Sequence, residues 1–186
     1  MAIPPHLGGH CGVTHVDEGA LQLLIDRLGV QSFLDIGCGP GGMVALARSK
    51  GLRALGIDGD PSVRARGILI HDFSRGPEEL VREQFDLGWC VEFVEHVEES
   101  FVENYLATIE KCSALLLTAA PPGTPGHHHV NCREAPYWIA MMKTRGFLLE
   151  EETTMLTRAA STMRREFVRK HGLVFRRLDT APPRGG

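Results

Sequence analysis

The sequence predicts an α/β fold built on a doubly wound, mostly parallel sheet of seven strands. Three observations predict it. Short apolar runs of strand length alternate with amphipathic stretches of helical length, and glycines follow several of these runs. The most apolar run, residues 114–118, is continuous enough to form a central strand buried on both faces. Strands that alternate with helices form right-handed β-α-β units, which favours a parallel sheet.

The first half of the chain supplies four of the expected strands. Asp17 is expected to cap a helix that ends at Gly29, because an Asp suits the first position and a glycine the last. Four strands and one helix follow, at 32–36, 42–49 (the helix), 53–57, 68–71 and 85–90. The link between the strands at 53–57 and 68–71 is barely long enough for a crossover helix. A shortened crossover, with one helical turn or none, is therefore expected between strands two and three.

The second half supplies three more strands. Apolar residues recur at helical spacing from Phe101 to Ile109, and the strand at 114–118 follows. Pro136 suits the first turn of the next helix, which Gly146 ends before a strand at 147–149. A single amphipathic helix is expected from Met155 to Phe167, before the last strand at 173–175.

Composition and length indicate one water-soluble domain. The 186 residues are 43% hydrophobic and 23% charged, which is ordinary for a globular protein. The longest apolar run, residues 114–120, is far shorter than the roughly 20 residues of a membrane span. The five cysteines form no C-x-x-C pair and no signal peptide is visible, so reduced thiols and a cytoplasmic location are expected. We expect one domain at 1–186, with a lid at 1–16 and a loose tail at 179–186.

A glycine-rich loop follows the first expected strand. Residues 37–42 read G-C-G-P-G-G and satisfy G-x-G-x-x-G, the pattern of dinucleotide-binding loops. Asp35 stands two positions before the first glycine and suits a cation better than a pyrophosphate. Pro40 also removes an N–H where a phosphate needs donors. The loop therefore favours a ligand with a cationic amino-acid part, and an NAD-dependent oxidoreductase is the weaker alternative.

The segment LDIGCGPGG resembles motif I of the class I S-adenosylmethionine-dependent methyltransferases, and the resemblance extends over about residues 30 to 150. The chain is similar to the small stand-alone members of this family, which implies a Rossmann-like fold and S-adenosylmethionine as cofactor. By this resemblance Asp58 accepts hydrogen bonds from the ribose hydroxyls, and Asp72 with Phe73 holds the adenine. The cofactor-binding residues that it implies are Asp35, Gly37, Cys38, Gly39, Gly41, Asp58, Gly59, Asp72, Phe73 and Cys90.

Candidate catalytic residues lie in two segments. His129, in the run His127–His129 after the fifth strand, is the preferred general base, because imidazole titrates near neutral pH. Glu92 and His96 follow the fourth strand and, with Glu95 and Glu99, are expected on one helical face beside the site. The alternative for both segments is a solvated surface.

Metal binding is not expected from the sequence. The histidines and cysteines at 6–15 and 127–132 match no spacing of a structural zinc site. The most consistent reading is a methyltransferase that acts on an oxygen or nitrogen atom of a small molecule, without a membrane partner.

A basic C-terminal stretch leaves one alternative open. Residues 153–177 hold seven lysines and arginines against one glutamate. Such a stretch could contact nucleic-acid phosphates, so a nucleic-acid methyltransferase or an RNA- or DNA-binding module is the alternative. Cations also commonly coat the exposed face of an amphipathic helix, which would make the stretch structural.

Overall fold

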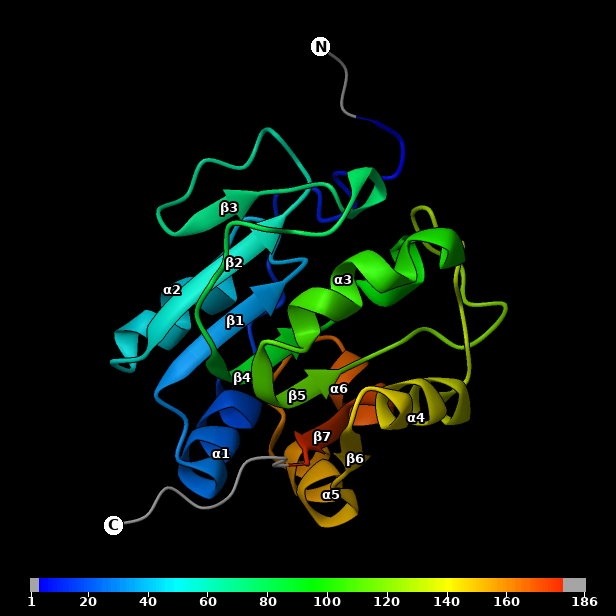
Figure 1. Ribbon diagram of the computed structural model, residues 1–186. Coiled ribbons are helices and arrows are strands. Elements are labelled where there is room, and N and C mark those ends of the chain that lie inside the picture. The colour runs from blue at the N-terminus through cyan, green and yellow to red at the C-terminus, as the bar shows by residue number, and fades with distance from the viewer. Residues whose placement is uncertain (1–3, 179–186) are drawn as a thin grey trace.

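The computed structural model describes residues 4–178, which form one seven-stranded sheet with helices on both faces (Figure 1). The strand order is β3-β2-β1-β4-β5-β7-β6, and β7 is antiparallel to both of its neighbours while the other pairs are parallel. The strands are β1 (Ser32–Ile36), β2 (Arg53–Asp58), β3 (Ile68–Ile70), β4 (Phe85–Cys90), β5 (Cys112–Leu117), β6 (Phe147–Leu149) and β7 (Leu173–Arg177). The predicted fold class, a mostly parallel and doubly wound sheet, is confirmed.

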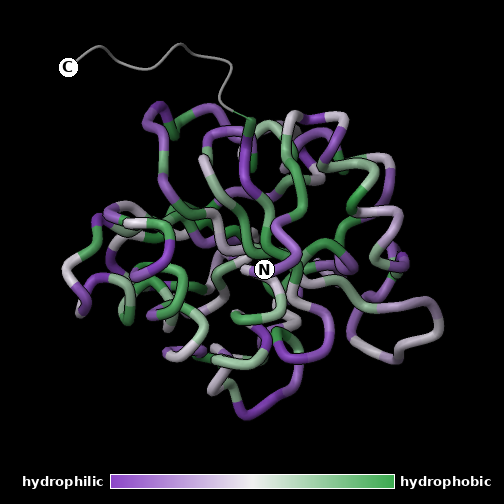
Figure 2. The backbone as a smooth tube through the Cα atoms, turned by 90° about the horizontal axis from the view of Figure 1, so that it is seen from below, coloured by the Kyte–Doolittle hydropathy of each residue, from purple (hydrophilic) through white to green (hydrophobic). Residues whose placement is uncertain are grey.

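Alternate side chains of the central strands pack into two cores on opposite faces of the sheet. Leu115 and Leu117 of β5 belong to one core, and Leu116 between them belongs to the other. The first core is covered by α3 (Val102–Ile109) and α4 (Ala135–Thr144). The second is covered by α1 (Glu18–Leu28), α2 (Gly42–Ser49) and α6 (Phe167–His171). Figure 2 shows hydrophobic stretches concentrated toward the middle of the molecule and hydrophilic ones mainly in its outer loops.

The crossover between β2 and β3 contains turns and no helix over residues 59–67, as the short link predicts. The residues after β3 form a short 3-10 helix, η1 (Phe73–Arg75). Because no helix separates β2 from β3, the polar residues that follow the two strands stay close to the sheet edge.

The expected helix from Met155 to Phe167 is wrong, because the chain there forms two helices, α5 (Glu151–Ala160) and α6. Helix α5 buries three threonines, while Met155 is 64% exposed. The chain leaves the helix at Ser161 because the Asp17 carboxylate accepts hydrogen bonds from the Ser161 hydroxyl and the Thr162 amide. The same carboxylate caps α1, as expected.

None of the helices within residues 4–178 combines the length and the apolar character that a bilayer span needs. The predicted loose tail at 179–186 and the first three residues of the predicted lid lie outside the described residues.

Candidate active site

A cavity of about 660 Å³ lies at the carboxyl ends of β1, β2 and β4. In an open α/β sheet ligands bind at this edge, beside the point where the strand order reverses, and here that point lies between β1 and β4. Three segments complete the walls: the N-terminal segment 6–15, the glycine loop after β1, and the histidine loop at 124–129.

The glycine loop lies directly under the cavity. Gly37 has a φ of 78°, which favours glycine, and a Cβ there would overlap the ring of Phe93. The amides of Gly37 and Cys38 both donate hydrogen bonds to the carbonyl of Ile57 at the end of β2. The loop is therefore fixed to the neighbouring strand and presents backbone rather than side chains to a ligand.

Asp35 supplies an unpartnered carboxylate beneath this loop. The residue is only 3% exposed, yet it lines the cavity. Among the described residues none gives its carboxylate a hydrogen bond or an ion pair. Burial, and then the nearby charge of Asp58, raise the pKa of Asp35 well above its ordinary value. A cationic group of a ligand placed here would pair with this carboxylate and supply the partner that the carboxylate lacks.

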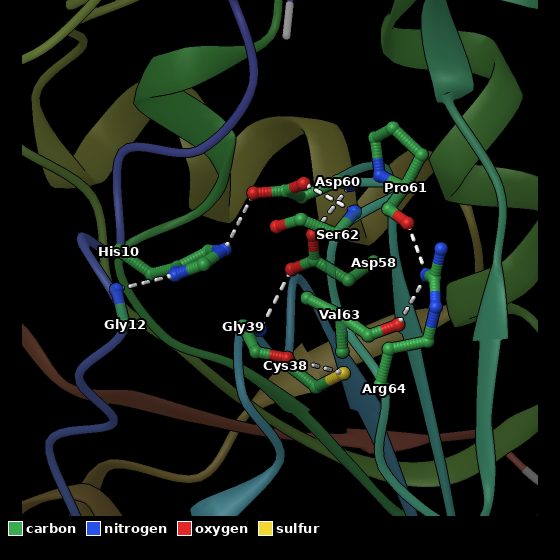
Figure 3. A network of polar contacts seen from close by, with 10 residues as sticks. All are labelled: His10, Gly12, Cys38, Gly39, Asp58, Asp60, Pro61, Ser62, Val63 and Arg64. Atoms are coloured by element: carbon green, nitrogen blue, oxygen red, sulfur yellow. Dashed lines mark hydrogen bonds and ion pairs between the residues drawn. The ribbon is translucent and has the colours of Figure 1, made fainter.

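Asp58 ends β2 and connects the glycine loop to the crossover (Figure 3). Its Oδ2 accepts a hydrogen bond of 2.6 Å from the Gly39 amide, and its Oδ1 accepts one of 2.8 Å from the Asp60 amide. On the far side of this network His10 Nε2 lies 3.1 Å from Asp60 Oδ2. The Asp58 carboxylate is thus held in one orientation at the cavity wall, with further lone pairs left to accept bonds from a ligand.

Asp72 and Phe73 line the cavity beyond β3. Asp72 Oδ1 accepts a hydrogen bond of 2.9 Å from the Ser74 amide, and its Oδ2 lies 3.1 Å from His6 Nε2. Burial raises the pKa of Asp72, but these hydrogen bonds outweigh it and hold the pKa below its ordinary value. The ring of Phe73 packs edge-on against Phe93, with the centroids 5.7 Å apart. An apolar wall therefore stands beside a fixed carboxylate.

The N-terminal segment closes one side of the cavity. Besides the contacts of His6 and His10, the hydroxyl of Thr14 accepts a hydrogen bond of 3.0 Å from the Gly42 amide, the first residue of α2. In dinucleotide-binding folds the pyrophosphate occupies this helix N-terminus. Here Thr14 takes one of the donors that a pyrophosphate would need, which weighs against the NAD alternative.

A second set of polar residues lines the cavity after β4. Glu92 follows β4 with a φ of 54°, unusual for a side-chain-bearing residue, and its amide donates to the Thr118 hydroxyl at 2.8 Å. The single helical face predicted for residues 92–99 is wrong. Two short 3-10 helices replace it, η2 (Val94–His96) and η3 (Glu99–Phe101). Glu95 consequently turns inward and is fully buried, whereas Glu99 turns outward to pair with Arg133 at 2.7 Å.

The histidine loop and the two residues after it are attached to Glu95 and His96 through backbone contacts. The carbonyl of Glu95 accepts hydrogen bonds from the amides of Val130 (3.0 Å) and Asn131 (3.1 Å). His96 Nδ1 lies 2.7 Å from the carbonyl oxygen of His127. These contacts bring the ring of His129 against that of His96, with centroids 4.9 Å apart.

Burial shifts the pKa values of Glu92, Glu95 and His96 toward their uncharged forms. It raises the pKa of Glu92 and of Glu95, and the negative charge of Glu92 raises that of Glu95 further. Burial also lowers the pKa of His96 to about 4, and the neighbouring imidazoles of His129 and His127 lower it further, although a hydrogen bond to the His127 carbonyl opposes them. At neutral pH His96 is therefore an uncharged imidazole.

The cavity brings together most of the residues that the sequence singles out. Those that line it are Asp35, Gly37, Cys38, Gly39, Asp58, Gly59, Asp72, Phe73, Glu92, His96 and His129. Two of the expected cofactor residues do not line it: Cys90 is fully buried, and Gly41 precedes α2 and packs against Ile68. Burial also raises the pKa of the Cys90 thiol well above its ordinary value.

Sequence reasoning missed several residues of the cavity wall. They are mostly apolar or aromatic, with one cation, and include Met43, Trp89, Phe93, Phe101, Arg165 and Phe167. Arg165 and Phe167 lie at the break between α5 and α6. The expectation of one continuous helix hid this break.

The strand order, the antiparallel β7 and a glycine-loop cavity at the carboxyl ends define a Rossmann-like domain that binds its ligand at this edge. Residues 34–115 match the family model of the methyltransferase domain. The matched segment contains the glycine loop, Asp58 and Asp72, so this part of the chain is similar to a methyltransferase domain.

Solved structures with the same fold are distant in sequence. One is the 1,6-didemethyltoxoflavin-N1-methyltransferase of Burkholderia thailandensis (17% identity, TM-score 0.59, covering 87% of this chain and 78% of that one). Another is the methyltransferase domain of bacterial CtHen1-C (13% identity, TM-score 0.58, covering 85% of this chain and 95% of that one). A third is the magnesium protoporphyrin IX methyltransferase of Synechocystis PCC 6803 (15% identity, TM-score 0.57, covering 84% of this chain and 78% of that one). No curated protein matches the chain in sequence.

Proposed function

We propose that the chain transfers a methyl group from S-adenosylmethionine to an oxygen or nitrogen atom of a small molecule. One observation carries the proposal. The same cavity is lined by an unpartnered carboxylate under the glycine loop and by side chains that can accept a proton. The carboxylate suits the cofactor, and the proton-accepting side chains suit an acceptor that must lose a proton.

The residues on the cofactor side fit S-adenosylmethionine. The buried Asp35 carboxylate has no cation of its own, and it would hold the ammonium of the methionine part. Asp58 would accept from the ribose hydroxyls, and Asp72 with Phe73 would hold the adenine. When bound, the cofactor supplies a methyl group on a positively charged sulfur.

The residues on the acceptor side can hold and remove a proton. Glu92, His96 and His129 line the cavity, and of these His129 or Glu92 would accept the acceptor's proton. The acceptor's electron pair forms the bond to the methyl carbon as the sulfur–carbon bond breaks and its electrons return to sulfur. Transfer of this kind depends chiefly on alignment in a site that excludes water, which the N-terminal segment supports as a lid.

Contacts within the chain favour a small acceptor over a nucleic acid. Five of the seven cations of the basic stretch have partners in the protein. Lys170 pairs with Glu166 and Arg176 with Glu150, and Arg158, Arg169 and Arg177 donate to backbone carbonyls. A cavity of this size is typical of small-ligand sites. Two of the similar structures are named for small acceptors, a toxoflavin precursor and magnesium protoporphyrin IX.

Methyl-labelled S-adenosylmethionine tests the proposal. The protein is incubated with the labelled cofactor and either a desalted small-molecule extract or total RNA, and the acceptor fraction is counted. The proposal predicts label in the small-molecule fraction and its loss in Asp58→Ala. Label that enters RNA instead would overturn the small-acceptor assignment in favour of a nucleic-acid methyltransferase.

A further inference from the structure

We propose that Glu95, His96 and His129 bind a divalent first-row transition-metal ion in the cavity wall, with Glu92 as a further oxygen donor. The convergence of these side chains supports the site, and a role for the ion in the reaction rests on the proposed function, in which the acceptor binds beside the ion.

The three side chains converge on one point. One ligand atom from each of Glu95, His96 and His129 lies within 4.8 Å of the other two. The first two residues belong to η2, and the third belongs to the loop that hydrogen-bonds to the Glu95 carbonyl. Two imidazoles and one carboxylate at this separation can close on a single ion with small side-chain rotations.

Both imidazoles are oriented as metal-binding histidines usually are. Nδ1 of His96 lies 2.7 Å from the His127 carbonyl oxygen, and Nδ1 of His129 lies 2.9 Å from the Thr124 carbonyl oxygen. Because a carbonyl oxygen only accepts, each Nδ1 must carry the hydrogen, which leaves the lone pair on Nε2. Metal-ligating histidines typically donate their second nitrogen to a carbonyl or a carboxylate in this way.

The Glu95 carboxylate is the independent sign that a ligand is missing. The residue is fully buried, and within residues 4–178 neither carboxylate oxygen has a hydrogen-bond partner of good geometry, although the amides of Glu95 and Ala120 and the Glu92 carboxyl group approach them. Burying an unsatisfied carboxylate costs free energy. The buried carboxylates of Asp17 and Glu78 avoid this cost, since Asp17 accepts four hydrogen bonds and Glu78 pairs with Lys111.

The donor set also indicates the class of ion. Two imidazoles and a carboxylate with open positions suit Mn²⁺, Fe²⁺, Co²⁺ or Zn²⁺ better than the all-oxygen preference of Mg²⁺. His96 and His129 line the cavity, so the open positions of the ion would face the acceptor.

An ion at this place favours an oxygen acceptor over an amine. With the ion bound, His129 is a ligand and no longer the general base. The coordinated hydroxyl loses its proton more easily, to Glu92 or to water, and keeps further lone pairs for attack on the methyl carbon. A coordinated amine has already used its one lone pair. The inference therefore narrows the proposed function to a hydroxyl-bearing small molecule.

Manganese binding tests the site directly. Chelator-treated protein is titrated with Mn²⁺, and the free ion is measured by electron paramagnetic resonance, with and without S-adenosylhomocysteine. Wild type is expected to bind one Mn²⁺ per chain, and Glu95→Gln and His129→Gln to weaken binding at least about tenfold. Glu99→Gln, an exposed neighbour of the same type, and His171→Gln are matched controls that should bind as wild type does.

A second measurement guards against misfolded variants. Glu95→Gln keeps the size of the side chain and removes only its ability to ionise, so without metal it should fold and melt near the wild-type temperature, yet gain no stability from Mn²⁺. Absence of Mn²⁺ binding to wild type, or unchanged binding by Glu95→Gln, would overturn the inference. Calorimetry with S-adenosylhomocysteine separates the two proposals: if it binds and Mn²⁺ does not, only the metal site fails.

Discussion

Replacing Asp35 with asparagine should have opposite effects on stability and on cofactor binding. The carboxylate is 3% exposed and has no partner among residues 4–178, so its ionised form is costly in the free protein. In the complex the same charge would face the cofactor ammonium. Asp35→Asn keeps the size of the side chain and removes only the charge.

The sign of the stability effect follows from the pKa. The folded-state pKa of Asp35 is raised above its ordinary value of 3.8, chiefly by burial. The unfolded chain therefore ionises first, and stability is lost as pH rises from about 3.8 through the folded pKa. Asp35→Asn lacks this loss, so it should be more stable by about 1 kcal/mol near neutral pH, with a Tm higher by a few degrees. The difference should vanish in acid.

The effect on binding has the other sign. A charge-assisted hydrogen bond is worth about 1.5–3 kcal/mol, so S-adenosylhomocysteine should bind Asp35→Asn roughly 10- to 100-fold more weakly in calorimetry. Asp26→Asn, an exposed carboxylate distant from the cavity, is the control and should change neither quantity. A variant that is less stable at neutral pH, or that binds the cofactor product as tightly as wild type, would refute the reasoning.

Two further predictions concern carboxylates outside the cavity. Burial raises the pKa of Glu78, but hydrogen bonds from Val81 and Lys111 outweigh it and lower the pKa below 4.5. Glu78→Gln should therefore cost about 2 kcal/mol in urea unfolding at neutral pH, and the difference from wild type should shrink as pH falls through the folded pKa; a difference that grows in acid would contradict this. Asp17→Ala removes the acceptor of the Ala20 and Thr162 amides at 3.1 and 2.8 Å, and should cost about 3 kcal/mol in the same assay. A loss below about 1 kcal/mol would show that water replaces these bonds.

The strands and the glycine side of the site were predictable because their signals are local. A continuous apolar run specifies a buried strand, and Asp58 or Asp72 at a strand end is placed at the sheet edge by that strand alone. The shortened crossover after β2 follows in the same way from its length.

The rest depended on contacts that sequence spacing does not encode. Helix α5 buries Thr153 and Thr154, whose hydroxyls bond to Arg27, Glu150 and the Val174 amide, and hydrophobicity alone selects the wrong face. The approach of His129 to Glu95 joins residues from two segments through backbone hydrogen bonds of the histidine loop. Neither residue type nor spacing signals such a contact.

Calorimetric titration with S-adenosylhomocysteine tests the central claim most directly, with NAD as the competing ligand and Asp58→Ala as the variant. The account predicts one binding site per chain for S-adenosylhomocysteine, no heat with NAD, and loss of binding in Asp58→Ala while Asp26→Ala binds as wild type does. Binding of NAD in place of S-adenosylhomocysteine, or unchanged affinity in Asp58→Ala, would contradict it.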